Sequence, residues 1–202
     1  MVDVDFPIIV LAAGASRRMR GRDKLLEDVD GEPLLRQQAR KALAVTSGPV
    51  LIALPPAPHP RYAALDGLTV QIVPVPDAAE GMNASLRAAF SALPADAKAA
   101  MLLLGDLPDL TSDDLRDVAN AVDLSTETLV WRGATANGAP GHPIVFNAAL
   151  FGVFATLKGD GGGREVIAQA KGHVQLVPLP ADRARNDLDT PEEWAEWRAK
   201  RR

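Results

Sequence analysis

The chain has 202 residues, enough for one domain with a buried core, and its 47% hydrophobic and 24% charged residues are ordinary for a soluble globular protein. The formal net charge of −4 at pH 7 argues against general electrostatic attraction to nucleic acid. We therefore expect a single domain, residues 1–202, with no nucleic-acid partner.

The sequence contains no cysteine, which excludes disulfides, thiolate metal sites and a cysteine nucleophile. No apolar run approaches the length of a membrane-spanning helix. The N-terminal residues MVDVDF are acidic and show no cleavage site for a secretory signal. We expect a cytoplasmic protein with no membrane partner.

The first predicted element is a short apolar strand, Ile8–Leu11, which leads directly into the small residues 12–16. Small residues let a ligand approach the backbone N–H groups, and Arg and Lys side chains supply positive charge. The pattern matches neither GxxxxGK[ST] nor GxGxxG, but it indicates a polyphosphate site. The alternative is a surface turn with a solvated basic run. Five cations follow the small residues within eight positions: Arg17, Arg18, Arg20, Arg22 and Lys24.

Predicted strands and helices alternate through the rest of the chain, which predicts an α/β domain of three layers with a mostly parallel sheet. Apolar runs predict strands at 50–54, 68–73, 99–104, 128–131, 144–146 and 174–177, and a short extended piece at 25–29. Apolar spacing and start signals at Pro33, Ser112 and Thr190 predict helices at 33–45, 81–93, from 112, at 148–157, 164–170 and 191–199.

Three loops leave predicted strands at the same edge of this sheet: those that start at Ala12, at Gly105 and after Val177. Ligands of open α/β sheets bind beyond the carboxyl ends of the strands. We therefore expect a single site that collects all three loops.

Asp106 follows the strand 99–104 directly, in the sequence Gly105-Asp106-Leu107-Pro108. A carboxylate at the end of a buried strand is well placed to hold a metal ion. Mg²⁺ often takes one or two protein carboxylates together with substrate phosphates. The alternative is a turn whose backbone is fixed by Pro108.

The segment 80–86, EGMNASL, is a helix start with small residues. Gly81 permits a ligand to approach closely, and the Ser85 hydroxyl can hydrogen-bond a base edge. From the chemistry alone, Ser85 is equally well a helix residue without a ligand.

Two glycine motifs lie further along the chain. Gly141, His142 and Pro143 precede a strand, where a lone histidine is more often structural than catalytic. Residues 159–164 spell GDGGGR, and these glycines can expose backbone to a pterin or a phosphate.

Asp187 and Asp189 alternate in the segment 186–190, NDLDT, so in an extended chain they share a face. Either of them can meet Asp106 across a metal ion. Thr190, followed by Pro191, also forms a good helix N-terminus. The two roles are compatible.

Six motifs in this order resemble the MobA-like NTP transferase family, and most closely its branch of MocA-type molybdenum cofactor cytidylyltransferases. The motifs are LAAGxxxRM followed by Lys24, GMxxSL, D-x-P at Asp106, GHP, GDxGAR (with Gly163 in place of alanine) and the final DTP. The resemblance spans nearly the whole chain and implies a Rossmann-like nucleotidyltransferase fold.

The resemblance also implies roles for single residues. Nucleotide binding falls to Leu11, Ala12, Ala13, Gly14, Arg18, Lys24, Gly81, Ser85 and Asp106. Catalysis falls to Arg18, Lys24 and Asp106, and Mg²⁺ binding to Asp106 and Asp189. Acceptor binding falls to His142, Asp160, Gly161, Arg164 and Asp187.

The implied reaction transfers CMP from CTP to the phosphate of molybdenum-loaded molybdopterin, giving the cytosine dinucleotide cofactor and diphosphate, with a molybdenum hydroxylase as client. Ala13 in LAAG favours CTP, since guanylyl members usually carry LAGG. The attacking phosphate is already anionic, so positioning and charge neutralisation suffice. Arg18 and Lys24 would hold the β- and γ-phosphates. As exposed cations they should contribute under about 1 kcal/mol to folding.

Two rival functions stay open. One is an enzyme of the same fold that uses GTP or another acceptor, such as a sugar 1-phosphate or methylerythritol phosphate; GHP and GDGGGR speak against another acceptor. The other is a chaperone that delivers the molybdenum cofactor without chemistry. The presence of Arg18, Lys24 and Asp106 together favours catalysis, because a carrier would not need all three.

Overall fold

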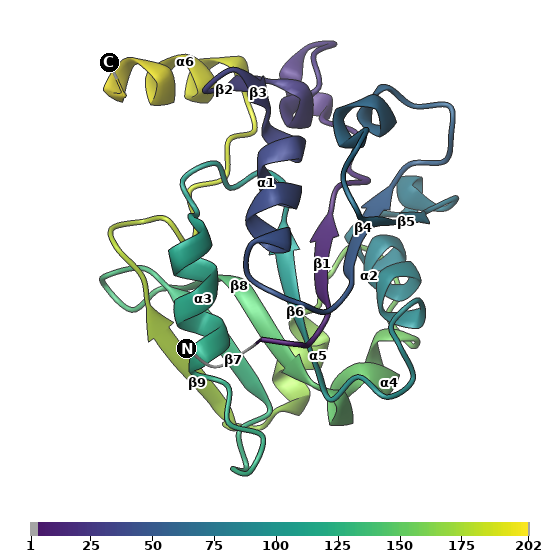
Figure 1. Cartoon of the computed structure of the whole chain (residues 1–202), viewed down its shortest axis with the longest axis vertical. Helices are drawn as coiled ribbons and strands as arrows, with labels where there is room; N and C mark the ends of the chain where they lie inside the picture. Colours follow the sequence, from purple (N-terminus) through teal and green to yellow (C-terminus); the bar gives the residue numbers. More distant parts are fainter. Residues whose placement is uncertain (1–3, 202) are drawn as a thin grey trace.

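A seven-stranded sheet forms the centre of the computed structural model, which describes residues 4–201 (Figure 1). The strand order is β5-β4-β1-β6-β8-β7-β9, and β8 runs antiparallel to its neighbours while the other pairs are parallel. The predicted mostly parallel sheet is therefore confirmed. The strands are β1 Ile8–Leu11, β4 Val50–Leu54, β5 Gln71–Pro74, β6 Ala99–Leu104, β7 Val130–Ala134, β8 Pro140–Asn147 and β9 Val174–Pro178.

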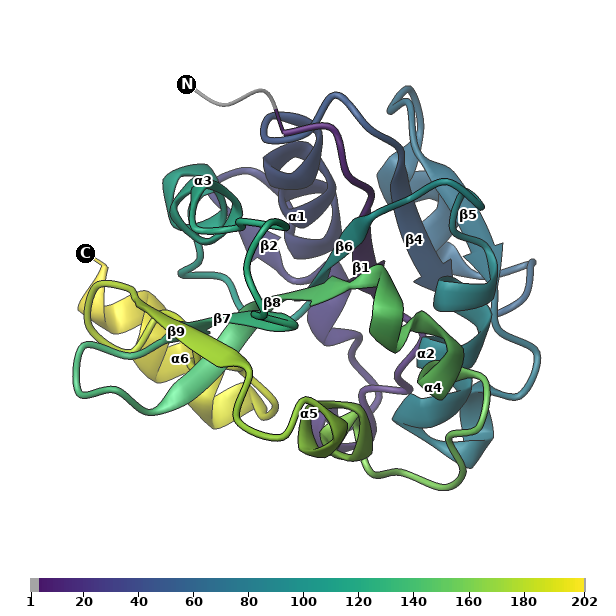
Figure 2. The same cartoon turned by 90° about the horizontal axis from the view of Figure 1, so that it is seen from below.

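Helices cover both faces of the sheet, as Figure 2 shows, so the predicted three layers are also confirmed. One face carries α1 (Leu34–Leu43) and α3 (Ser112–Asn120). The other face carries α2 (Met82–Ser91), α4 (Phe151–Phe154) and α5 (Arg164–Gln169). No helix within residues 4–201 is long and apolar enough to cross a membrane.

The last helix, α6 (Pro191–Lys200), lies at the carboxyl edge of the sheet, beside the small hairpin of β2 (Asp28–Val29) and β3 (Glu32–Pro33) in Figure 1. Five short 3₁₀ turns complete the described elements: η1 Arg17–Met19, η2 Lys24–Leu26, η3 Pro60–Leu65, η4 Ala78–Glu80 and η5 Ala148–Leu150.

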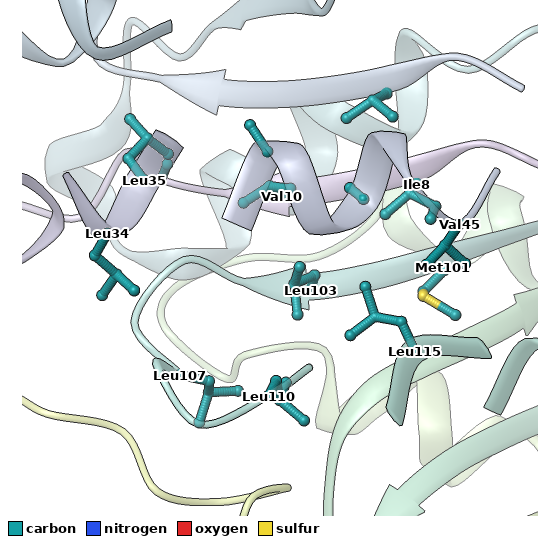
Figure 3. Close-up of a cluster of buried hydrophobic side chains, with 14 of the residues drawn as sticks. Ile8, Val10, Leu34, Leu35, Val45, Met101, Leu103, Leu107, Leu110 and Leu115 are labelled. Carbon is teal, nitrogen blue, oxygen red and sulfur yellow. The ribbon is translucent and has the colours of Figure 1, made fainter. Parts of the chain in front are cut away.

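The strand β1 is apolar at every position because both of its faces are buried. Ile8 and Val10 belong to the cluster under α1 and α3, which Figure 3 shows together with Leu34, Met101 and Leu115. Ile9 and Leu11 point the other way, into the cluster under α2, α4 and α5. Burial on both faces fixes the strand firmly, and with it the position of the loop that follows.

Of the three predicted helix start signals, only Thr190 acts as predicted. Pro33 does not open α1 but precedes it, since the helix begins at Leu34 and Pro33 is paired in β3. Thr190 caps α6 in a capping box: its hydroxyl accepts from the Glu193 N–H at 3.2 Å, and the Glu193 carboxylate accepts from the Thr190 N–H at 2.9 Å. The predicted cap at Ser112 is wrong by one residue. Thr111 has the extended backbone of a cap, and its hydroxyl accepts from Asp114, so Ser112 is the first helical residue.

Several predicted boundaries differ from the structure. The strand predicted at 144–146 begins at Pro140, so Gly141, His142 and Pro143 lie within it and do not precede it. The strand predicted at 68–73 begins at Gln71, and the one at 128–131 begins at Val130. In each case pairing with a neighbouring strand sets the bounds, for example Gln71 with Leu51. The extended piece predicted at 25–29 is mostly wrong, since a 3₁₀ turn covers its beginning and only Asp28–Val29 are paired.

Candidate active site

A cavity of about 930 Å³ lies at the carboxyl ends of β1, β4 and β6. One wall is the loop of residues 12–24, called loop 12–24 below. The start of α2 and Asp160 form another part of the lining. The cavity brings together all nine residues predicted for nucleotide binding: Leu11, Ala12, Ala13, Gly14, Arg18, Lys24, Gly81, Ser85 and Asp106.

Lys24 is the centre of an ion cluster at one end of this cavity. Its Nζ donates to Asp106 Oδ2 and, at 2.7 Å, to Asp189 Oδ1. Arg18 forms an ion pair with the other oxygen of Asp189. The side chains of Lys24, Asp106 and Asp189 are only 15%, 17% and 12% exposed, so this cluster is largely shielded from water. The loops after β1, β6 and β9 therefore meet, as the sequence predicted.

The charges in the cluster stabilise one another. Burial lowers the pKa of Lys24, but the carboxylates of Asp106 and Asp189 more than offset this effect and hold the pKa above its ordinary value. Burial alone would raise the pKa of Asp189, but Lys24, helped by Arg18, lowers it. Burial and then the nearby carboxylates raise the pKa of Asp187. Lys24 is therefore a firmly held ammonium between two carboxylates.

Asp106 and Asp189 also have the features of ligands for a divalent cation. Their oxygens converge on one cation, the ammonium of Lys24, and Asp106 Oδ1 is buried without a hydrogen-bond partner in the described chain. Residues 4–201 contain no group of three or more His, Asp or Glu side chains placed to hold a metal. Two carboxylates suit Mg²⁺, which typically completes its coordination with substrate phosphates and water.

The backbone of loop 12–24 offers further donors. The N–H groups of Ala13, Gly14 and Ala15 have no hydrogen-bond acceptor within residues 4–201, and all three residues line the cavity. Ser16 has a left-handed backbone with φ of 50°, which turns the chain into η1. Free amides beside Lys24 and Arg18 form an arrangement that binds anions.

Gly81, at the start of α2, lies beside Asp160 in the wall of the cavity. The Asp160 carboxylate accepts from the Met82 N–H at 2.7 Å. A Cβ at Gly81 would lie 2.6 Å from Asp160 Oδ1, and φ at Gly81 is +117°, so only glycine fits. The structure thus brings Asp160, predicted for the acceptor, to the wall that also carries Ser85.

The other residues predicted for the acceptor do not line this cavity. His142 lies on β8 with its Nδ1 enclosed and without a partner in the described residues, and burial, helped by Arg132, lowers its pKa to about 4. Gly161 and Arg164 lie around the start of α5. Asp187, two residues before Asp189, is partly exposed.

Asp109 links the two segments that carry the ion cluster, and the sequence analysis did not identify it. Its carboxylate accepts from the Asn186 side-chain amide and, at 2.8 Å, from Trp197 Nε1. These contacts join the loop that carries Asp106 to the segment that carries Asp189. The sequence did contain a signal for this contact. An acid lies three residues after Asp106, and an asparagine lies three residues before Asp189.

Comparison with known families finds a match over most of the chain. The family model described as the MobA-like NTP transferase domain matches residues 8–174.

The curated relatives similar to the chain include the following two. The "Probable molybdenum cofactor guanylyltransferase" of Synechococcus elongatus is 38% identical over 125 residues, 61% of this chain. The matched region spans 62% of that relative's length. The "Purine catabolism protein PucB" of Bacillus subtilis is 28% identical over 199 residues, 92% of each chain.

Solved structures match along nearly the entire chain. Rv0371c from Mycobacterium tuberculosis H37Rv is similar with a TM-score of 0.82 and 28% identity, covering 97% of this chain and 98% of that chain. A complex of that protein with manganese matches with a TM-score of 0.78 and 25% identity, covering 96% and 97%. The chain has the nucleotidyltransferase fold.

Proposed function

The chain belongs to the MobA-like NTP transferase family, and from this premise we propose that it transfers CMP from CTP to the phosphate of molybdenum-loaded molybdopterin. One observation carries the proposal: Lys24, Arg18, Asp106 and Asp189 converge at one end of a cavity whose walls also carry free backbone amides. Such a site can hold a triphosphate beside a pair of metal-binding carboxylates. We propose that residues 1–202 act as one domain.

In the proposed reaction, a phosphate oxygen of molybdopterin attacks the α-phosphorus of CTP. The new P–O bond forms as the bond to the oxygen that bridges the α- and β-phosphates breaks, and its electron pair leaves with diphosphate. Arg18 and Lys24 hold the β- and γ-phosphates and stabilise the charge on the leaving group. The free amides of Ala13 and Ala15 bind phosphate oxygens, and Ser85 contacts the base.

Asp106 and Asp189 would hold Mg²⁺, which neutralises charge on the phosphates when it is bound. In the structure, the ammonium of Lys24 donates hydrogen bonds to both carboxylates. A triphosphate competes for the cations of Lys24 and Arg18 because it presents more negative charge than one carboxylate. Nucleotide binding would therefore free Asp106 and Asp189 to hold the metal ion. The manganese complex of Rv0371c supports a divalent ion.

The choice of acceptor rests on the family motifs and on the similarity to a protein named as a probable molybdenum cofactor guanylyltransferase. That name also supports a second candidate, transfer of GMP from GTP to the same acceptor. Ala13, at the position where guanylyl members usually carry glycine, supports CTP. We further propose a cytoplasmic location and a molybdenum hydroxylase as client of the product.

The test is an incubation of the purified chain with Mg²⁺, molybdenum cofactor and each of the four NTPs in turn, followed by mass analysis of the products. Of the four NTPs, we expect only CTP to give a dinucleotide product, the cytosine dinucleotide, together with diphosphate. Asp106→Asn should give no product, whereas Asp113→Asn, the same change at an exposed side chain, should match the wild type. Product from GTP alone would establish the second candidate. Cofactor binding without any dinucleotide would favour the delivery chaperone.

A further inference from the structure

Arg61 is a buried arginine that packs against loop 12–24 and also lines the cavity, with 1% of its surface exposed. Its Nε and Nη2 donate to both oxygens of Asp23, at 2.7 and 2.8 Å. Nη1 donates to the carbonyl oxygen of Ala12 at 2.5 Å, and Nη2 donates to that of Gly14 at 2.7 Å. A longer bond of 3.2 Å reaches the Ser16 hydroxyl. One guanidinium thus joins four residues of the loop.

These contacts determine where the free amides of the loop point. In a planar trans peptide, the C=O and the N–H of the following residue point in opposite directions. The Ala12 carbonyl shares its peptide with the Ala13 N–H, and the Gly14 carbonyl shares its peptide with the Ala15 N–H. Because Arg61 holds both carbonyls from one side, the two N–H groups are turned to the other side. Both of these amides lack an acceptor within residues 4–201, and both residues line the cavity.

The charge of Arg61 is already neutralised. Burial alone would raise the pKa of Asp23, but its hydrogen bonds and charge pairing with Arg61 lower it, so the pair is ionised. The side chains are 2% and 21% exposed. A bidentate guanidinium–carboxylate pair leaves little net positive charge for a ligand. Arg61 therefore acts on a phosphate through the geometry of the loop, while Lys24 and Arg18 supply the attraction.

We propose that Arg61 is a positioning residue that aims the N–H groups of Ala13 and Ala15 at the triphosphate of the nucleotide. The inference rests on the proposed function, since it needs a polyphosphate in this cavity. A lysine at position 61 would keep the charge but would lose the fork that reaches two carbonyls and a carboxylate together.

The first test measures binding of inorganic tripolyphosphate, which has no base, to the wild type, Arg61→Lys and Arg61→Ala by calorimetry. We expect both variants to bind tripolyphosphate roughly 10- to 100-fold more weakly than the wild type. Each tenfold loss corresponds to about 1.4 kcal/mol of binding free energy. Millimolar guanidinium should restore binding to Arg61→Ala, because it can fill the vacated space. It should not restore binding to Lys24→Ala, the control that lacks a different cation.

A merely structural role predicts a different result. Thermal melting would then fall in both variants, while the folded fraction would keep the wild-type affinity for tripolyphosphate; that outcome would overturn the inference. If wild-type protein binds neither CTP nor tripolyphosphate, the proposed function fails and the inference fails with it. Intact binding in wild type and in both variants would refute the inference alone.

A second test needs only the wild type, so it holds even if both variants fail to fold. With ¹⁵N-alanine labelling, tripolyphosphate should shift the amide resonances of Ala13 and Ala15 more than that of Ala12. The Ala12 N–H is already bonded to the Ala53 carbonyl at 2.9 Å and provides an internal control. Unchanged amides at Ala13 and Ala15 in the complex would overturn the inference.

Discussion

Replacement of Lys24 by methionine is expected to destabilise the fold by about 2 kcal/mol at neutral pH and low salt. Lys24 Nζ donates to one oxygen each of Asp106 and Asp189, so these oxygens lie within about 5 Å of each other. Without the ammonium, two such charges repel by roughly 3 kcal/mol at an effective dielectric constant of 20. Arg18 still pairs with Asp189 and offsets part of this, but its side chain is 69% exposed and screened by water. Methionine keeps most of the apolar stem, so the loss reports charge.

Urea unfolding at pH 7 measures this effect. Lys24→Met should be less stable than wild type, and Lys24→Met with Asp106→Asn should regain most of the loss, since one of the repelling charges is gone. Millimolar Mg²⁺ should stabilise Lys24→Met more than wild type, because the ion can neutralise the carboxylates that the ammonium has left. Lys200→Met, which removes an exposed lysine with a surface partner, is the control and should change little. Stability of Lys24→Met within about 0.5 kcal/mol of wild type would refute the reasoning.

Three further predictions concern residues in the cavity and the buried His142. Asp106→Asn should abolish dinucleotide formation with the fold retained, and Asp189→Asn should be milder; the reverse order in turnover assays would show that the metal ligands are assigned wrongly. Gly81→Ala should cost about 1–3 kcal/mol in urea unfolding and weaken CTP binding, because the new Cβ meets Asp160 in a strained backbone; wild-type values for both would contradict this. His142 has a pKa of about 4 in the fold against 6.5 in the unfolded chain, so stability is lost as the pH falls from about 6.5 to 4, by up to about 3 kcal/mol. His142→Gln should remove that part of the pH dependence, and an unchanged pH profile would count against it.

The central strands could be predicted with their observed bounds. β1, β4 and β6 are apolar on both faces, so each run ends where the buried sheet ends. β5 and β7 could not be placed as well, because strand pairing rather than composition decides where they begin. The residues predicted for nucleotide binding line one cavity because most of them follow the carboxyl ends of these well-predicted strands or start a helix.

The contacts between distant charged residues could not be predicted. Arg61 lies after a proline-rich segment, and nothing local indicates that its side chain pairs with Asp23 and is buried against loop 12–24. The expectation that Lys24 is an exposed cation is wrong for the same reason. Its two carboxylate partners are 82 and 165 residues away in the sequence, and they enclose it. The corresponding expectation for Arg18 is correct, because its side chain is largely exposed.

The most direct measurement follows labelled phosphorus from the nucleotide into the product. The purified chain is incubated with Mg²⁺, molybdenum cofactor and CTP labelled either at the α- or at the γ-phosphate. We expect the α label in the cytosine dinucleotide and the γ label in diphosphate, with both transfers dependent on the cofactor and absent in Asp106→Asn. Retention of both labels in CTP, or appearance of the γ label in the molybdenum cofactor, would contradict CMP transfer at this site.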